Sequence, residues 1–193
     1  MKPSAFFLSV LLLCLITAGG LRAQCILANP SFEVSGSGGA VFAGWDQFGT
    51  TGSVTLAFHG SAAARVSGQN TGSVNESGYW QQLDCEVGQQ WRIAGHVFNP
   101  AAAPLTGDSG ARVKVEWFGA GGGLIDLASY SVADASSPPD QYLAFALLSP
   151  PAPAGTASLR LVLTVLQGQN APVPDLYYDQ ITCYSTTYPT IDP

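Results

Sequence analysis

Apolar residues recur along this chain in short runs that are separated by clusters of Gly, Pro, Ser and Asn. The runs are rich in β-branched, leucine and aromatic residues and show little helical periodicity, which is typical of strands. They cover residues 26–33, 41–48, 53–58, 61–67, 78–84, 89–98, 111–118, 123–131, 141–148, 156–166 and 176–184. About ten to eleven short strands in one uninterrupted domain predict an all-β sandwich or jelly roll.

Alternation within the runs predicts which side chains point outward. The outward positions of four runs carry Trp80, Gln82, Arg92, His96, Lys114, Glu116 and Arg160. We interpret these side chains as one sheet face that forms a shallow polar cleft. An aromatic ring beside hydrogen-bonding groups suits a polyhydroxylated ligand such as a sugar. The alternative is that the basic residues are solubilising charges on exposed strands.

The chain offers little for catalysis. His59 and His96 are its only histidines, and it has no Gly-x-Ser-x-Gly elbow, His-Glu-x-x-His motif or phosphate-binding loop. A glycosidase needs two carboxylates that flank a cleft, whereas Glu116 is the only acid on the predicted face. We therefore expect a protein that is not an enzyme.

The first residues have the pattern of a secretory signal peptide. Lys2 precedes an almost uninterrupted apolar run over residues 5–16, and small residues lead up to Ala23. The run is short for a membrane span, which needs about 20 residues. Cleavage after Ala23 would leave one domain over residues 24–186 and a short tail over residues 187–193. We expect the mature protein to be secreted, either extracellular or periplasmic.

The net charge of the predicted mature chain restricts the classes of partner that it is expected to bind. Without the signal peptide, the basic residues are Arg65, Arg92, Arg112, Lys114 and Arg160, against thirteen acidic residues, a formal charge of about −8. This excess of negative charge argues against nucleic acid and against anionic membranes as partners.

Three cysteines remain in the predicted mature chain, namely Cys25, Cys85 and Cys183. An odd count in an oxidising compartment predicts one bridge and one free or intermolecular thiol. We favour a Cys25–Cys183 bridge because these residues sit at the two ends of the domain. Such a bridge would pair the first run with the last and set Asn29 opposite Asp179. Cys85 is then either a buried thiol or the link of a dimer.

The order of short motifs resembles a known family. "NPSFE", "GW", "HG", "WQQL", "VGQQWRIAGHV", "WFGAGG", "PAPAGTASLRLVL" and "YYDQI" follow one another over residues 26–183. In this order they are similar to the galactose-binding-like jelly rolls of the CenC type, which are carbohydrate-binding modules of secreted glycoside hydrolases. The resemblance implies a galactose-binding-like β-sandwich that is non-catalytic and binds a poly- or oligosaccharide or a cell-surface glycan.

The same resemblance implies a structural calcium ion where the first and last strands meet. Carried over to this chain, its ligands are Glu33, Asp179 and the carbonyl of Ser31, with further oxygens from the turn at His59 and Gly60. Calcium accepts several hard oxygen ligands in irregular geometry, so this set is chemically coherent. Gln180 stands where family members have a second acid.

The sequence is also consistent with a second function. We expect a single domain with no catalytic domain beside it for a binding module to target, and the predicted mature chain has an odd number of cysteines. An extracellular structural or protein-interaction domain of the same fold, without sugar binding, would account for both features.

Overall fold

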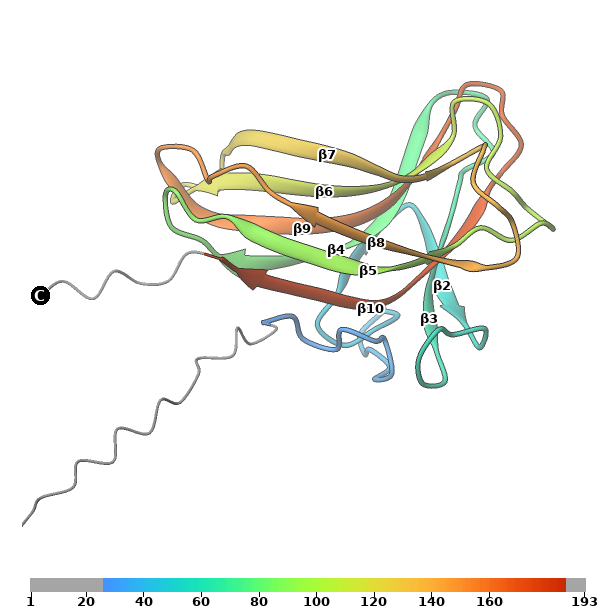
Figure 1. The fold of residues 1–193 in the computed structure, drawn as a ribbon, viewed down its shortest axis with the longest axis horizontal. Coiled ribbons are helices and arrows are strands. Elements are labelled where there is room, and N and C mark those ends of the chain that lie inside the picture. The colour runs from blue at the N-terminus through green and yellow to red at the C-terminus, as the bar shows by residue number, and fades with distance from the viewer. Residues whose placement is uncertain (1–25, 187–193) are drawn as a thin grey trace, which may run out of the picture.

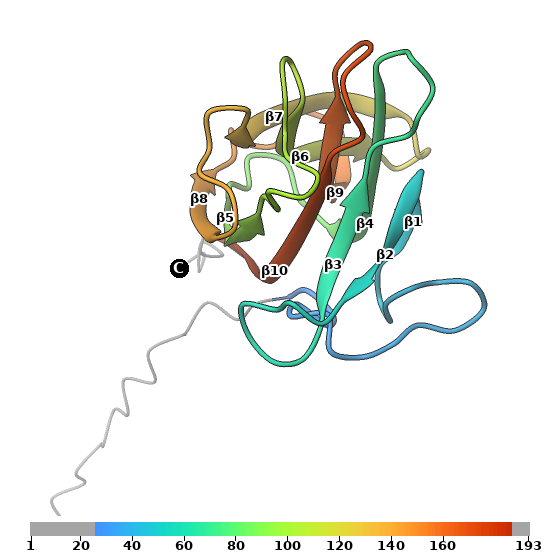
Figure 2. The same cartoon turned by 90° about the vertical axis from the view of Figure 1, so that its right-hand side faces the viewer.

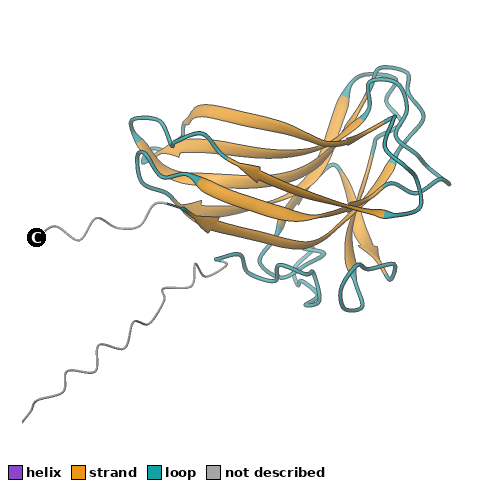
Figure 3. Cartoon of the chain, viewed as in Figure 1, coloured by secondary structure: helices purple, strands orange, loops and turns teal. Residues whose placement is uncertain are grey.

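The computed structural model describes residues 26–186, which contain ten strands and no helix (Figure 3). The strands are β1 (Asp46–Phe48), β2 (Thr50–Val54), β3 (Ala63–Ser67), β4 (Asn75–Asp84), β5 (Trp91–Phe98), β6 (Gly110–Gly119), β7 (Leu124–Asp134), β8 (Tyr142–Leu148), β9 (Thr156–Gln167) and β10 (Asp175–Ser185). The predicted all-β class and number of strands are confirmed. No helix among the described residues is long and apolar enough to cross a membrane.

The strands form two antiparallel sheets that pack face to face (Figures 1 and 2). One sheet, here sheet A, has the order β1-β4-β9-β6-β7, and the other, sheet B, has the order β2-β3-β10-β5-β8. Since β4, β6 and β9 lie in sheet A while β5 lies in sheet B, consecutive strands often belong to opposite layers. This distribution decides which predicted site residues share a face.

The core fills the space between the sheets, and alternation places its side chains there. Sheet A contributes Val113, Val115, Leu159, Leu161 and Leu163, all with no exposed surface. Sheet B contributes Ile93, Val97, Leu176 and Tyr178, which are equally buried. The tryptophans Trp45, Trp91 and Trp117 also belong to the core, and each is at most 3% exposed.

Two buried tyrosines bond the sheets to each other. The Tyr178 hydroxyl on β10 lies 2.9 Å from the Thr164 carbonyl on β9 and 3.2 Å from the Arg112 carbonyl on β6. The Tyr79 hydroxyl on β4 donates to the Gly52 carbonyl on β2 at 2.8 Å. Both contacts cross from one layer to the other, so they fix the relative position of the sheets.

A single glycine carries the chain from one sheet to the other. Gly49 separates β1 in sheet A from β2 in sheet B and has a φ of 68°. A Cβ at this position would lie 2.3 Å from Ser77 Oγ, and that hydroxyl also accepts the Thr50 N–H. Only glycine combines the left-handed conformation with this close approach.

The expected first strand over residues 26–33 is wrong. Asn29 and Phe32 both have positive φ, and the Asn29 side chain bonds the backbone of Val34 and Ala43, so these residues form a turn. The segment still runs beside the last strand, because Ile26 N–H donates to the Cys183 carbonyl and Ile181 N–H donates to the Pro30 carbonyl. The predicted meeting of the two ends therefore exists without strand pairing.

Several predictions fall partly or wholly outside the described residues. The signal peptide over residues 1–23, the tail over residues 187–193 and Cys25 of the predicted bridge are among them. Cys183 is buried in the core. Cys85 is only 3% exposed, and its sulfur accepts the Trp91 indole N–H at 3.4 Å. An intermolecular disulfide needs an accessible thiol, so the suggested dimer through Cys85 is not supported.

Candidate functional site

Five of the seven predicted ligand-binding residues lie together on the outer face of sheet A. Gln82 and Glu116 are the two cross-strand neighbours of Arg160. Trp80 and Lys114 flank Val162, which lies two residues further along β9. Because side chains of paired residues point to the same face, these two rows form one continuous surface.

Arg92 and His96 do not belong to this surface, which corrects the predicted single face. Both lie on β5 in sheet B and point to the opposite outer side of the sandwich. Alternation identified their outward direction, but it contains no information on which sheet a strand joins. His96 is also covered, because the Phe58 ring stacks on it with centroids 3.6 Å apart. Burial lowers the pKa of His96, and its Nδ1 is a buried atom without a hydrogen-bond partner.

Arg160 occupies the middle of the sheet A face. Its guanidinium carbon lies 4.2 Å from the centre of the Trp80 ring and 4.4 Å from the centre of the Phe118 ring. Its Nε donates to the Gln82 side-chain oxygen at 3.3 Å. These contacts hold a planar cation against two aromatic rings, an arrangement that is favourable electrostatically.

An ion pair crosses the same face. Lys114 Nζ on β6 lies 2.5 Å from Glu76 Oε2 on β4, and both side chains are largely shielded, with 17% and 28% exposed. Within residues 26–186, the Glu116 carboxylate accepts no hydrogen bond. The face therefore holds one neutralised pair, one stacked cation and one carboxylate that is open to a ligand hydroxyl.

A depression of about 330 Å³ opens between these groups. Its walls are Phe48, Glu76, Trp80, Lys114, Glu116, Arg160 and Val162. Phe48, Glu76 and Val162 were not among the residues predicted from the sequence. Glu76 has the same parity as Trp80 and Gln82, so an earlier start of β4 would have revealed it. Phe48 belongs to an edge strand that only its pairing with β4 brings to this surface.

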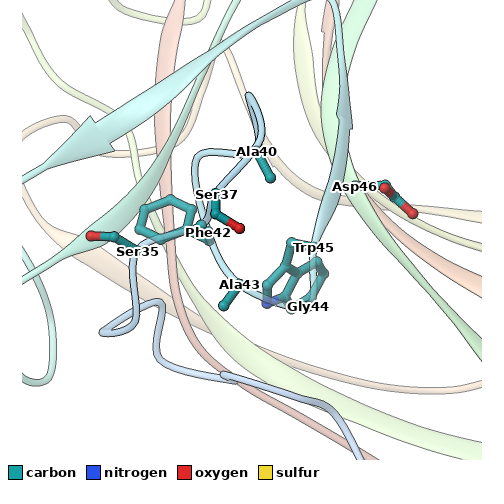
Figure 4. A pocket seen from close by; sticks show the side chains of 9 residues that line it. Ser35, Ser37, Ala40, Phe42, Ala43, Gly44, Trp45 and Asp46 are labelled. Carbon is teal, nitrogen blue, oxygen red and sulfur yellow. The ribbon is translucent and has the colours of Figure 1, made fainter.

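A second hollow, of about 410 Å³, lies under the loop before β1 (Figure 4). Ser35 and Asp46 stand at opposite sides of this hollow, with Ser37, Ala40 and Phe42 between them. Its aromatic residues, Phe42 and Trp45, are each 2% exposed, and the Trp45 indole N–H donates to the Asn29 carbonyl. The hollow thus has no half-exposed aromatic ring, and Asp46 is the single charged residue on its wall.

Glu33 and Asp179, two of the three residues predicted to hold calcium, both bond the turn over residues 58–62. The two Glu33 carboxylate oxygens accept the Ser61 N–H, the Ser61 hydroxyl and the Ala62 N–H at 2.7 to 3.1 Å. The Ser61 hydroxyl and these backbone bonds lower the pKa of Glu33. Asp179 is fully buried and accepts the His59 N–H at 2.8 Å and the Gln180 N–H at 2.6 Å. Desolvation, assisted by the charge of Glu33, raises the pKa of Asp179.

Gly60 allows this junction to close. It has a φ of 80°, and a Cβ there would lie 2.3 Å from Glu33 Oε1. Two carboxylates approach each other here, as a calcium site would need, while the His59, Ser61 and Ala62 N–H groups of the turn point to them. In residues 26–186 no group of three or more His, Cys, Asp and Glu side chains could hold a metal ion. Backbone carbonyls, among them that of Ser31, would have to complete the shell.

Similarity to known proteins is detectable in three dimensions. No protein-family model and no curated protein matches the chain. The CBM22-1 xylan-binding domain from Paenibacillus barcinonensis superimposes with a TM-score of 0.55 at 14% identity, over 82% of this chain and 92% of that domain. TmCBM61, solved with β-1,4-galactotriose, gives a TM-score of 0.51 at 14% identity, over 84% and 99% of the two chains. The chain shares the fold of carbohydrate-binding modules.

Larger proteins contain the same fold as one part. The arabinose-bound MgGH51 α-L-arabinofuranosidase matches with a TM-score of 0.59 and 17% identity, over 89% of this chain but 28% of the enzyme. The enzymatically active domain of tailspike protein 4 from bacteriophage CBA120 matches with a TM-score of 0.59 and 14% identity, over 83% of this chain but 21% of that domain. At these identities the similarity shows the fold alone.

Proposed function

We propose that the protein is a non-catalytic carbohydrate-binding domain and that the outer face of sheet A binds the saccharide. The observation that carries this proposal is the depression beside Trp80, where an aromatic ring, a guanidinium, an ammonium and an open carboxylate surround one space. The fold supports it, because solved carbohydrate-binding modules share this architecture. The CenC-type assignment and secretion after signal cleavage remain parts of the proposal.

Each group has a distinct role in this proposal. A sugar presents C–H faces to the Trp80 ring and hydroxyls to the polar groups around it. Arg160 and Lys114 donate to ring and hydroxyl oxygens, and Glu116 accepts from hydroxyls. Gln82 orients Arg160 through the bond to its Nε. The charges of the four ionised side chains around the depression cancel, so neutral hydroxyl-rich chains suit it better than ionic ones.

Titration with xylohexaose and β-1,4-galactotriose, followed by tryptophan fluorescence and calorimetry, tests the site. Trp80→Ala should weaken binding at least about tenfold, equivalent to about 1.4 kcal/mol. Glu116→Gln should weaken it less, since the amide oxygen still accepts a hydrogen bond. Arg92→Ala, an exposed arginine on the other sheet, is the matched control and should leave this site unchanged. Equal binding by Trp80→Ala and the unmodified protein would remove the site from this face.

We also propose a structural calcium ion at the junction of Glu33 and Asp179. A divalent cation would relieve the repulsion between a buried carboxylate and its charged neighbour. When bound, the ion would link the N-terminal turn, the 58–62 turn and β10. Calcium should raise the melting temperature and a chelator should lower it, and Glu33→Gln should abolish both responses. An identical melting temperature with calcium and with chelator would refute the ion.

The position of Arg160 supports an alternative function, in which the domain does not bind sugar. Its guanidinium lies over the Trp80 ring that a sugar would use, and Leu124 and Leu127 on edge strand β7 are about half exposed. A structural or protein-interaction domain of the same fold would tolerate a covered ring and use the exposed leucines. A broad glycan screen separates the two functions, because such a domain would bind no glycan at all.

A further inference from the structure

The outer face of sheet B carries a row of aromatic rings. Tyr177 on β10, Phe98 on β5 and Tyr142 on β8 are successive cross-strand neighbours. The rings of Tyr177 and Phe98 stack with centroids 5.5 Å apart and planes 3° apart, and the centroids of Phe98 and Tyr142 are 5.1 Å apart. This row lies on the opposite side of the sandwich from Trp80.

A polar pair stands at the end of the row. Arg65 on β3 is the other cross-strand neighbour of Tyr177. Its Nη2 lies 3.2 Å from Asp175 Oδ2, and its Nε donates to Asp175 Oδ1 at 3.2 Å. The Ser67 hydroxyl also donates to Asp175 Oδ1. The Arg65 side chain is 44% exposed, and a guanidinium has more N–H donors than this pair uses. Arg65 can therefore donate to a ligand while it stays fixed by Asp175.

A depression of about 500 Å³ lies beside Tyr177, the cross-strand neighbour of Arg65. It is lined by Ser53, Val54, Thr55, Leu56, Ala62 and Tyr177. Hydroxyls, aliphatic surface and one aromatic residue thus meet in a space larger than the depression beside Trp80. The nearby charges cancel within the Arg65–Asp175 pair, so the site, like the one on sheet A, favours a neutral ligand with many hydroxyls.

We propose that this depression is a second saccharide site and that the protein bridges two glycan chains on opposite faces. The inference rests on the proposed function of the sheet A face. A sugar ring would pack against Tyr177 and Leu56, and its hydroxyls would exchange hydrogen bonds with Ser53, Thr55 and Arg65. The sites are separated by two sheets packed about 10 Å apart, so separate chains fill them.

Calorimetric titration of the purified protein with xylohexaose counts the sites. The unmodified protein should bind two molecules per chain, Trp80→Ala one, Arg65→Ala one, and the double variant none. Arg92→Ala is the matched control, since it removes another exposed arginine from the same sheet face and should keep both sites. Thermal melting confirms that each variant folds, and Thr55→Ala provides a second disruption of the site without breaking the ion pair.

Turbidity of a polysaccharide solution measures whether the protein bridges two glycan chains. Soluble xylan should become turbid with the unmodified protein and with Arg92→Ala, but stay clear with Trp80→Ala or Arg65→Ala. One site per chain that Trp80→Ala abolishes and Arg65→Ala and Thr55→Ala leave intact overturns the second site while the proposed function stands. One site that only Arg65→Ala abolishes would locate saccharide binding at the sheet B depression, but it would overturn both the sheet A site and bridging. Binding at neither site overturns both.

Discussion

Arg160 shows how a single side chain can organise a sheet face. Arginine in the middle of a strand serves most often as a solvated charge. Here its guanidinium is stacked on Trp80 and Phe118 and held by Gln82, so it acts as a rigid part of the surface. The alternation of β9 predicted its outward direction. Its contacts depend on β4 and β6, which only the three-dimensional arrangement brings to either side of β9.

Replacing Arg160 should therefore change stability as well as binding. Cation–π contacts at partly exposed sites are worth about 0.5–1 kcal/mol each, so Arg160→Ala should lower the free energy of unfolding by about 1 kcal/mol. Arg160→Lys should recover less than half of this loss, because an ammonium lacks the planar stacking surface. Urea denaturation of both variants measures the effect. Arg92→Ala is the control, and a loss as large as that of Arg160→Ala would argue against a special role of the stack.

Glu33 should make stability depend on pH in acid. Hydrogen bonds from Ser61 and Ala62 hold its pKa below the ordinary value of 4.5. A lowered pKa in the folded state gives stability that is present above 4.5 and is lost as the pH falls through the folded value. The melting-temperature difference between the unmodified protein and Glu33→Gln should therefore be greatest near neutral pH and shrink on acidification. Glu86→Gln, an exposed substitution elsewhere, is the control, and a pH-independent gap for Glu33→Gln would exclude this linkage.

At the scale of elements, the turn over residues 58–62 depends on Gly60. Gly60→Ala combines a positive φ with a Cβ placed 2.3 Å from Glu33 Oε1, so it should lower the free energy of unfolding by about 1–3 kcal/mol. Gly122→Ala is the matched control, because Gly122 has a φ of 78° and open space at its Cβ. Chemical denaturation should show a clearly smaller loss for the control. Equal losses would mean that backbone strain alone, and not displacement of Glu33, explains the effect.

The strands with alternating residues were predictable, and the N-terminal segment was not. Residues such as Ile93 and Leu161 have the period of a half-buried strand, so runs around them were placed within a few residues. Residues 26–33 contain the same apolar types, but Asn29 adopts a positive φ and uses its side chain to close a turn. The sequence does indicate a break at Asn29 and Pro30. What alternation does not report is that Phe32 turns into the core and that the segment follows β10 without pairing.

At the scale of the whole molecule, the sequence does not show to which of the two sheets each strand belongs, and this assignment decides which site residues share a face. Five of the seven predicted site residues share a face because β4, β6 and β9 are neighbours in sheet A, whereas β5 with Arg92 and His96 joins sheet B. Whether a side chain points outward follows from the alternation within its own strand. The sheet to which that strand belongs follows from how all ten strands pair. The same pairing brings Arg65, Tyr177 and Phe98 into a row that no stretch of sequence contains. Both proposed saccharide sites therefore depend on strand pairing within the two sheets, and the sandwich itself depends on how these sheets pack against each other.

That packing depends on polar bonds as well as on apolar burial, and Tyr178 provides the test. Its hydroxyl is buried and lies within hydrogen-bond distance of carbonyls on β6 and β9, and burial raises its pKa. Tyr178→Phe would leave those carbonyls without this donor, so the free energy of unfolding should fall by about 1–2 kcal/mol with an unchanged denaturant slope. Tyr130→Phe removes a more exposed bond to the Leu148 carbonyl, which water can replace, so its loss should stay below about 0.5 kcal/mol. Similar small losses in both variants would show that apolar packing alone joins the sheets.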